Sequence, residues 1–474
     1  MSTITYNDFG GGLDRRLPVS VQDANKLWAL RNAYITLGKR IAKRPGLLPL
    51  AAGLTGSFGL EAISGRLKVF VDRGAAFTPP AIMDSIALDK PAGLTGQSLD
   101  RVISADLFQG YPYVVARYTD RSVRHHYVDT NPTTPVTDVN CPQTASVTKA
   151  ASRLYAIAGE NVRYSAAGAA RDWTTASDAG FLPAALQAET KSSTTAVGTF
   201  QGNYLVVFFS ESVQLWSVAT DPSANALSKN IAGVGCEEPL SLAAFSNDLV
   251  FLSPFGLRSM TVQVQTSRID DNDVGVPIDK LVVPDIEAGA AAADPFDTFG
   301  IWIHQLGQYW LVMDMGTYSK AWVYTYSKSS KIACWSEYVF QVRITALATL
   351  GGRIYLRTID ELFEFSAEQY TDADQLVPVE VQMAFQDAKT PGVNKQVWAA
   401  DLVTTGNCQF SVKYDPRDMG KESIPQTING DTRPGDLVPV DVVAPALAPV
   451  FRHSADEPFE LDALSLYYNL LGTQ

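Results

Sequence analysis

A β-hairpin unit recurs along most of this chain, and this repeat constrains the fold more than any other sequence feature. The clearest copy covers residues 344–370, ITALATLGGRIYLRTIDELFEFSAEQY, where apolar and polar residues alternate on either side of a Gly-Gly turn. Alternation with a period of two, interrupted by Gly or Asp, is typical of antiparallel strands. Similar stretches occur upstream, and the turn residues of the copies are, in order, Gly65, Gly110, Ala151, Gly202, Asn247, Gly307 and Gly352.

The turns of these copies lie 45, 41, 51, 45, 60 and 45 residues apart. A β unit repeating at about 45 residues has the period of a propeller blade. Because one blade cannot bury both of its faces, blades stack on their neighbours around a central channel. We therefore expect an all-β protein in which residues 51–375 form a β-propeller of about seven blades, with six to eight as the range.

The two ends of the chain do not carry the repeat. Residues 1–50 include VQDANKLWALRNAYI, whose apolar face suits a short helix, so we expect an extended or short helical segment that closes the propeller or forms an interface. Residues 376–474 contain strands of period two and a stretch rich in Pro, Gly and Asp. They predict a C-terminal β-sandwich-like domain, one of whose early strands is a second candidate to close the ring.

Charge is distributed unevenly along the chain. The formal net charge is −12, yet residues 1–50 hold eight Lys or Arg against three Asp. A strongly acidic protein does not wrap nucleic acid through its general surface, because neutralising phosphate needs clustered Lys and Arg. The basic segment is either a solvated rim or a contact for an acidic partner or DNA phosphate. Its candidate interface residues are Arg15, Arg16, Lys39, Arg40, Lys43 and Arg44.

An acidic insertion, residues 266–297, accounts for the 60-residue spacing. Asp270, Asp271 and Asp273 lie in a DDNDVG stretch that superficially resembles a calcium loop. A calcium loop needs a bidentate Glu at its twelfth position, and counting from Asp270 that residue is Leu281. We therefore expect no calcium. The following IDKLVVPDIEAGAAAA is expected to form a short helix or excursion that contacts a neighbouring subunit, with these three aspartates as interface candidates.

Motifs for catalysis or cofactor binding do not occur in the sequence: there is no GxGxxG after a strand, no GxxxxGK[ST], no GxSxG and no HExxH. His125 and His126 are adjacent and so point to opposite faces of a strand, while His304 and His453 are isolated. We expect hydrogen-bonded surface histidines, no catalytic residue, no cofactor and no metal. The tryptophans at strand positions are expected in the blade core: Trp216, Trp302, Trp310, Trp322 and Trp335.

The sequence also gives expectations about compartment and connections. Its four cysteines lie far apart without a CxxC pair, as expected of reduced thiols in a protein made in the cytosol. No apolar run reaches the roughly 18 residues of a membrane span, and the N-terminus has no signal-peptide pattern. The stretch from Arg163, RYSAAGAARDWTTASDAGFLPA, is expected to be a loop between blades. Its SDAG lacks the spacing and the Trp of the sialidase SxDxGxTW box.

Several segments resemble one protein family in their order along the chain. FGGGLDRRLP, ANKLWALRNAYIT and GKRIAKRPGL precede the hairpins, as at the start of many phage tail proteins. GTFQGNYLVVFFSESVQLWSV from Gly198, VPIDKLVVP from Val276 and the blade from Lys331 are similar to later segments of the same family. This is the tail nozzle or hub family of short-tailed bacteriophages, also called packaged-DNA stabilisation or tail accessory proteins. The resemblance covers most of residues 1–385.

The resemblance implies a structural virion protein, made in the host cytoplasm and located in the tail. Such proteins form a hexameric ring below the portal and the head-to-tail adaptor, continue the DNA channel and retain packaged DNA. Tail fibres or tailspikes dock at the side, and a tail needle or plug is a further partner. The C-terminal domain would be the platform that packs subunits together. Genomic DNA would pass without sequence-specific binding, because an acidic wall repels phosphate.

Two alternatives from other classes stay open. A propeller hydrolase or lyase acting on polysaccharide would place converging carboxylates in the funnel and act as a monomer. A cytosolic propeller scaffold of the WD type would bind proteins, although the sequence lacks the GH and WD pairing of those repeats.

Overall fold

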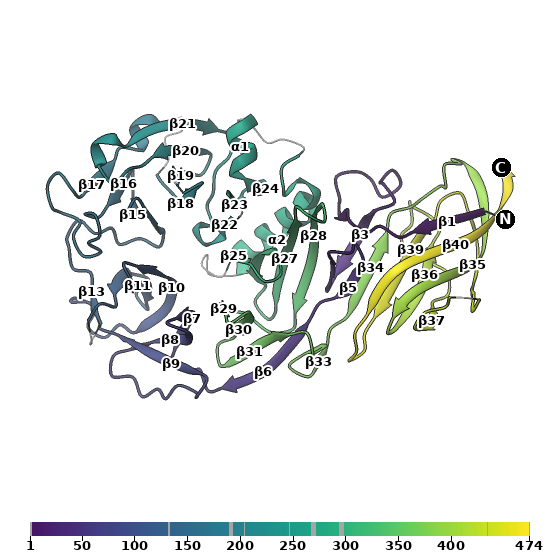
Figure 1. Ribbon diagram of the computed structural model, residues 1–474, viewed down its shortest axis with the longest axis horizontal. Coiled ribbons are helices and arrows are strands. Elements are labelled where there is room, and N and C mark those ends of the chain that lie inside the picture. Colours follow the sequence, from purple (N-terminus) through teal and green to yellow (C-terminus); the bar gives the residue numbers. More distant parts are fainter. Residues whose placement is uncertain are drawn as a thin grey trace.

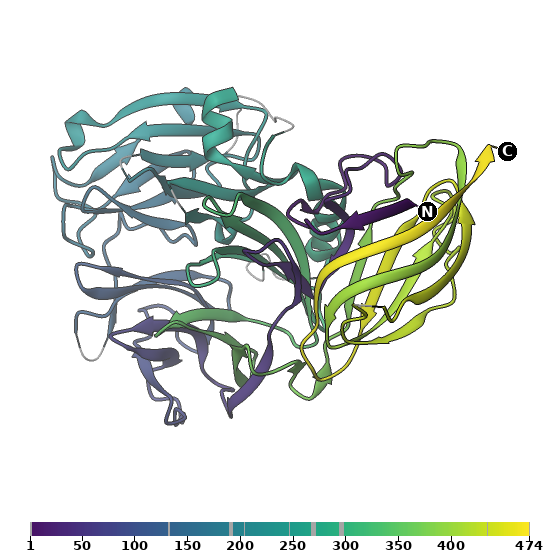
Figure 2. The same cartoon turned by 45° about the vertical axis from the view of Figure 1, so that its right-hand side comes forward.

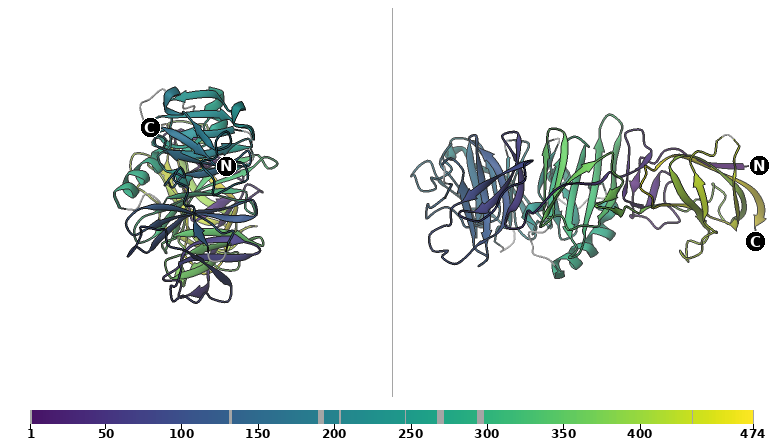
Figure 3. Two further views of the ribbon diagram at one scale, coloured as in Figure 1. Left: turned by 90° about the vertical axis from the view of Figure 1, so that its left-hand side faces the viewer. Right: turned by 90° about the horizontal axis from the view of Figure 1, so that it is seen from below.

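The structure is a computed structural model with two parts, a ring of small β-sheets and a smaller domain that carries both chain termini at its far end (Figure 1). The two parts lie side by side along the long axis, which makes the molecule elongated (Figure 3). The residues it describes are 2–130, 133–188, 193–202, 204–245, 247–266, 272–292, 298–433 and 435–473.

Within the described residues, seven sheets surround a common centre as the blades of a propeller, which confirms the predicted fold class. Neighbouring strands within a blade are antiparallel, except for a parallel pair in blade one. Blade one contains β7 (Phe58–Ile63), β8 (Arg66–Asp72) and β9 (Met83–Leu88); blade two contains β10 (Leu99–Phe108), β11 (Tyr111–Tyr118), β12 (Val123–Tyr127) and β13 (Thr134–Pro135); and blade three contains β14 (Val147–Ala150), β15 (Arg153–Ala158), β16 (Asn161–Tyr164) and β17 (Gly180–Leu182). Blade four contains β18 (Ala196–Phe200), β19 (Tyr204–Phe208), β20 (Ser212–Ser217) and β21 (Ala226–Ala232), and blade five contains β22 (Ala243–Phe245), β23 (Asp248–Ser253) and β24 (Gly256–Ser259). Blade six contains β25 (Phe299–Ile303), β26 (Gln308–Asp314), β27 (Ser319–Ser327) and β28 (Ile332–Phe340), and blade seven contains β29 (Ala346–Leu350), β30 (Arg353–Arg357), β31 (Glu361–Ser366) and β6 (Gly46–Ala52).

The turn that repeats in the sequence joins the first and second strands of every described blade. Each predicted turn position has a positive φ, including 74° at Gly65, 67° at Asn247 and 45° at Ala151. Positive φ in a short hairpin turn matches the right-handed twist of the flanking strands. Gly and Asn adopt this conformation readily, which is why these residues mark most copies of the repeat.

Hydrophobic clusters lie between neighbouring blades. On β26, Trp310 and Val312 belong to the cluster shared with blade seven, whereas Tyr309, Leu311 and Met313 belong to the cluster shared with blade five. Both faces of the strand are therefore buried, which explains why its apolar residues run almost continuously. Each blade is stabilised by contact with its neighbours, as the repeat predicted.

The ring is closed by a strand from the N-terminal side of the repeats. β6 pairs in antiparallel register with β31 and supplies the fourth strand of blade seven. The expectation that an early strand of the C-terminal domain closes the ring is therefore wrong. The nearest such strand, β32 (Thr371–Asp372), pairs with the far edge of β6 and forms a small hairpin with β33 (Gln375–Leu376).

The smaller domain is a sandwich of two sheets built from both ends of the chain. In Figure 2 the N-terminal strand runs alongside the long C-terminal strand, with which it pairs. One sheet contains β38 (Val438–Ala444), β35 (Val393–Thr405), β40 (Glu460–Thr473), β5 (Ile41–Lys43), β4 (Ala33–Ile35) and β1 (Ser2–Tyr6). The other contains β2 (Gly12–Leu13), β3 (Lys26–Arg31), β34 (Val379–Met383), β39 (Ala448–His453), β36 (Asn407–Lys413) and β37 (Gln426–Asn429).

The helix expected in VQDANKLWALRNAYI is wrong, because this stretch forms β3 and β4. Asn32 stands between the two strands with a φ of 53° and redirects the chain from one sheet to the other. β3 lies between strands of blade six and β34, so hydrogen bonds to both neighbours outweigh the local preference for a helix.

The propeller and the sandwich form one continuous body. The sheet of blade six runs on through β2 and β3 into the second sheet of the sandwich. A single hydrophobic cluster extends from Trp335 of blade six through Leu27 of β3 to Phe451 of β39. The two domains are therefore held in a fixed relation by hydrogen bonds and by a shared core.

The described helices are short and lie between blades, except η2, which lies between two strands of blade four. The helix expected in the acidic insertion is confirmed as α2, and α1 precedes it after blade five. The α-helices are α1 (Met260–Thr266) and α2 (Asp279–Ala292), and the single-turn 3₁₀ helices are η1 (Ala185–Gln187), η2 (Pro222–Ala224), η3 (Pro239–Ser241) and η4 (Val276–Ile278).

Candidate functional site

The central channel of the propeller is lined by the innermost strands of all the described blades and encloses about 370 Å³. Its wall combines apolar side chains with polar groups, and hydroxyl groups from different blades lie along it: Ser104, Thr148, Thr199 and Thr345. A cavity of this size matches a small-ligand pocket rather than a passage for a nucleic-acid duplex.

Glu61 on β7 is the one carboxylate among the described residues that line this channel. Its pKa is raised to about 7, chiefly by burial and to a smaller extent by the charge of Asp106, while a hydrogen bond from the Ala62 amide to its Oε1 opposes the rise. Asp106 itself forms an ion pair with Lys149 at 2.8 Å. A glycosidase needs two carboxylates held across a cleft, and the described channel lining does not supply that pair.

The paired histidines of β12 are structural. They do point to opposite faces of the strand: His125 hydrogen-bonds to the Tyr113 hydroxyl at 2.8 Å, and His126 to the Tyr118 hydroxyl at 3.1 Å. Both are fully buried, so the expectation of surface histidines is wrong for this pair. Burial lowers the pKa of His125 to about 4 and that of His126 to about 3, which keeps both rings neutral at pH 7.

The other two histidines, His304 and His453, differ in their exposure to solvent. His304 is exposed and accepts a hydrogen bond from the Trp302 indole at 3.0 Å. His453 is buried in the sandwich, where its ring stacks on Phe459, so the expectation of a surface histidine is wrong here too. Among the described residues, no group of three or more His, Cys, Asp or Glu side chains gathers where it could hold a metal ion.

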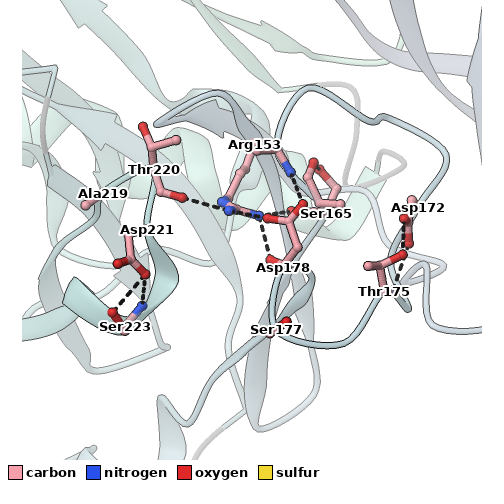
Figure 4. Close-up of polar contacts among 12 residues, drawn as sticks. Arg153, Ser165, Asp172, Thr175, Ser177, Asp178, Ala219, Thr220, Asp221 and Ser223 are labelled. Atoms are coloured by element: carbon pink, nitrogen blue, oxygen red, sulfur yellow. Dashed lines mark hydrogen bonds and ion pairs between the residues drawn. The ribbon is translucent and has the colours of Figure 1, made fainter.

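The loop that follows β16 lies within blade three, between β16 and β17, and not between blades as expected. It wraps around the buried guanidinium of Arg153, which donates to the carbonyl of Ser165 at 2.9 Å and to a carboxylate oxygen of Asp178 at 2.5 Å (Figure 4). Arg153 also donates to the Thr220 carbonyl of blade four at 2.7 Å. Asp178 thus fixes the loop to Arg153, and Arg153 joins blade three to blade four.

Tryptophans and cysteines fill the core. Four of the tryptophans expected in the blade core are buried, namely Trp216, Trp310, Trp322 and Trp335, while Trp302 is half-buried and stacks on Phe245. All four cysteines are buried free thiols, and burial raises the pKa of each to about 12. Such thiols are poor nucleophiles because the reactive thiolate is scarce at pH 7.

The predicted basic cluster divides into an outer and an inner set. In the outer set, Arg15 lies over the Trp28 ring at 3.6 Å, and burial lowers its pKa to about 10. The other outer residues form intrachain ion pairs at the surface: Arg16 with Asp14 (2.7 Å), Lys39 with Asp8 (2.9 Å) and Arg40 with Asp462 (3.2 Å). These side chains remain candidates for a subunit interface.

The inner set, Lys43 and Arg44, is buried, so the solvated-rim interpretation is wrong for both residues. Arg44 forms a two-point ion pair with Asp372, with Nη1–Oδ1 at 2.9 Å and Nη2–Oδ2 at 2.5 Å, and both side chains are 0% exposed. Lys43 donates to the Ala455 carbonyl at 2.7 Å. Burial, together with the nearby Arg44 charge, lowers the pKa of Lys43 to about 8.

Arg44 also binds one residue of the sandwich and one residue of blade six. Its Nε donates to the Asn32 side-chain oxygen at 3.0 Å, and Nη2 donates to the Val339 carbonyl at the end of blade six at 2.8 Å. The Asn32 amide donates in turn to the Pro378 carbonyl at 2.8 Å. We call Asn32, Arg44 and Asp372 the joint hub, since they tie the propeller to the sandwich. Asn32 and Arg44 belong to two of the motifs that carry the family resemblance.

The acidic insertion folds back on its own chain. Asp273 is buried and accepts hydrogen bonds from the Ser259 amide at 3.0 Å and from the Gln263 side chain at 2.6 Å, and burial raises its pKa to about 6. On α2, Asp285 pairs with Lys320 of blade six at 2.9 Å. Asp270 and Asp271 lie outside the described residues. Contact of this insertion with a neighbouring subunit stays a prediction.

Sequence reasoning missed the joint hub and the arginine-rich pocket described below. A signal for the hub was present, because an Asn in RNAYI and an Arg before Pro in KRPG are residues suited to positive φ and to buried pairing. Their partner, Asp372, lies 328 residues from Arg44 and carries no local pattern.

Within the described part of the chain, no helix is both long and apolar enough to span a bilayer.

No family model and no curated protein sequence matches the chain. The solved structures similar to it include a chain of the mitotic checkpoint complex, with 12% identity, coverage of 76% of this chain and 90% of that chain, and a TM-score of 0.35. Hsv2 from Kluyveromyces lactis has 10% identity over 58% of this chain and 79% of its own, with a TM-score of 0.30. Hsv2 from Kluyveromyces marxianus has 8% identity over 63% and 79%, also at 0.30. At these values we draw no functional conclusion from the likeness.

Proposed function

We propose that this chain is a structural subunit of a larger assembly, and specifically a tail nozzle subunit of a short-tailed bacteriophage. The observation that carries the proposal is the rigid joint between the two domains. A ring needs two different faces of one subunit in a fixed relation, because each subunit contacts its neighbours through a heterologous interface. The sheet shared by blade six and the sandwich supplies such a fixed relation.

The motif residues support the same proposal. Asn32 and Arg44 lie in segments that resemble the nozzle family, and in the structure they bind each other at the joint hub. These segments thus help to hold the propeller to the sandwich, so proteins with the same two domains would be expected to share them. The net charge of −12 suits a ring whose wall repels DNA phosphate, so that DNA is retained without adhesion.

A second candidate is an interaction scaffold that acts as a single copy. It is favoured by the closure of the propeller within one chain, because β6 completes blade seven without a strand from a partner. The hydrolase alternative is not proposed, since the described channel lining lacks a pair of carboxylates.

The test is the mass of the purified protein in solution, measured by light scattering alone and then with the tail adaptor. The nozzle proposal expects six copies of the 51.4 kDa chain in one particle, either alone or on the adaptor. Negative-stain images should then show a six-fold ring. A monomer that binds no tail component would contradict the nozzle proposal and favour the scaffold.

A further inference from the structure

A second pocket, of about 460 Å³, opens beside the central channel between blades seven, one and two. It lies on the face of the propeller where the innermost strands β7, β10 and β29 begin. Its lining shares four residues with the channel, so the pocket is continuous with one mouth of the channel: Gly59, Arg101, Val102 and Thr345.

Arginines dominate the polar lining of this pocket. Of its described lining residues, five are arginines, and the one carboxylate is Asp100. The arginines, which we call the arginine pocket, come from blade two, from blade seven and from the segment that precedes blade seven: Arg101, Arg117, Arg121, Arg343 and Arg357. In a chain with 38 Lys and Arg against 50 Asp and Glu, this is a local reversal of charge.

These arginines are held in place by contacts within the chain. Arg117 donates to Asp100 at 2.7 Å, and Arg343 forms an ion pair with the buried Asp314. Arg357 is buried, and its guanidinium donates to the carbonyls of Gly59 at 2.6 Å, Leu54 at 3.2 Å and Thr358 at 3.3 Å, so it forms part of the pocket wall. Arg101 and Arg121 have interactions of their own as well. Each guanidinium has five N–H donors in a rigid fork, so an arginine oriented by one partner can still bind a further anion.

The shape and composition of the pocket favour a short acidic peptide over a nucleic acid. A nucleic-acid strand would extend past the pocket onto a chain whose net charge is −12, and repulsion would oppose it. A peptide can place a few carboxylates in the pocket alone. Beside the arginines the lining includes Phe58, Val102 and Ile359, the last 56% exposed, which suits apolar side chains next to acidic ones.

We propose that the arginine pocket is a docking site for an acidic peptide segment of a partner protein. Carboxylates of the peptide accept hydrogen bonds from the more accessible guanidinium groups, those of Arg101 and Arg121, because guanidinium binds carboxylate in two-point geometry. A neighbouring apolar side chain packs on Phe58 and Ile359. The inference does not rest on the assembly proposed above, because a nozzle subunit and a scaffold would both use such a site.

Fluorescence anisotropy on the full chain tests this proposal with a labelled hexapeptide, Asp-Glu-Leu-Asp-Glu-Asp, and its Asn/Gln counterpart as the neutral control. We expect the acidic peptide to bind at micromolar concentrations and at least tenfold more tightly than the neutral one. Raising the salt concentration from 50 to 500 mM should weaken binding severalfold, because ion pairs are screened.

The test variant is Arg101→Gln with Arg121→Gln, which leaves the buried Arg357 and the Arg343–Asp314 pair intact. It should weaken binding of the acidic peptide at least tenfold. The matched control is Arg353→Gln, since Arg353 lies on β30 at the opposite end from Arg357 and is 64% exposed. This control should stay within twofold of the wild type. Circular dichroism and a thermal melt verify that each variant is folded.

Three outcomes would overturn the proposal. One is absence of binding by the acidic peptide at millimolar concentration. Another is equal binding by the double variant and the wild type, which would place the peptide elsewhere. The third is tighter, pocket-dependent binding of inorganic phosphate or of a six-nucleotide DNA strand, which would assign the pocket to phosphate groups instead.

Discussion

The propeller and the joint hub are stabilised in opposite ways. In the propeller, hairpins of nearby residues stack through apolar clusters, as β26 does between blades five and seven. At the joint, segments from the two ends of the chain meet around a buried ion pair, Arg44 with Asp372. Apolar stacking tolerates variation as long as volume is conserved. A buried charge pair does not, because removal of one partner leaves an uncompensated charge.

This difference suggests separate tasks for the two regions. A stack of blades offers many loops on a stable disc, so its surface can vary. The joint must hold the sandwich at one angle to the disc, and a hydrogen-bonded ion pair with a defined geometry does this better than apolar contacts alone. The contrast can be tested by substitutions in each region.

The largest effect is expected at the joint hub. Arg44→Met should lower the free energy of unfolding by about 3 to 5 kcal/mol, because Asp372 would stay buried without its partner. Denaturant unfolding at pH 7 measures the change. Adding Asp372→Leu should recover most of the loss, since both charges are then absent. If Arg44→Met costs less than 1 kcal/mol, the hub is not what holds the joint.

The next effect concerns closure of the ring. Leu47 on β6 is 0% exposed and packs between blades six and seven, so Leu47→Ala should cost about 3 kcal/mol. The matched control is Leu48→Ala, because Leu48 on the same strand is 37% exposed. It should cost less than about 1 kcal/mol. Equal losses, measured by denaturant unfolding, would mean that β6 is not a packed strand of blade seven.

A smaller, pH-dependent effect is expected in the channel. Burial raises the pKa of Glu61 from 4.5 to about 7, so the folded state binds more protons than the unfolded state between these values. Stability therefore falls as pH rises through this window, by up to about 3 kcal/mol. Glu61→Gln should remove this dependence and make the protein more stable than the wild type at pH 8.

Thermal unfolding of both proteins at pH 5 and pH 8 measures the Glu61 effect. Glu368→Gln, an exposed glutamate in a turn, is the control and should leave the pH dependence as in the wild type. If the thermal stability of Glu61→Gln changes between pH 5 and pH 8 as much as that of the wild type, Glu61 is solvated in the channel.

The smallest effect is expected for the outer basic set. Arg40 pairs with Asp462 at 3.2 Å, and its side chain is 47% exposed. Arg40→Ala should therefore change the free energy of unfolding by less than about 1 kcal/mol, and less still in high salt. A loss as large as that of Arg44→Met would remove the distinction between the outer and inner sets.

Local patterns made much of the propeller predictable. The turn residues from Gly65 to Gly352 were identified from alternation and from residues that tolerate positive φ, and both signals arise within a few neighbouring residues. The helix in α2 was predictable for the same reason. The strand around Leu27 was not, because β3 is held between β28 and β34, both of which are hundreds of residues away along the chain.

The candidate sites were less predictable. Six basic residues were selected for their charge, yet Lys43 and Arg44 are buried and the outer residues have partners in the same chain. The arginine pocket combines residues from 101 to 357, and none of its arginines lies in a charge run. Charge density along the sequence does not reveal which side chains converge in space.

The sequence by itself determined the blades, their number to within one and their hairpin turns, since the hairpins depend on contacts between residues that are close along the chain. Only the tertiary structure decided which strand closes the ring, how the two chain ends build one sandwich, and which charges are buried. These features depend on pairing between distant segments, such as Arg44 with Asp372. The free energy of such pairs comes from burial and geometry that exist only once the whole chain has folded.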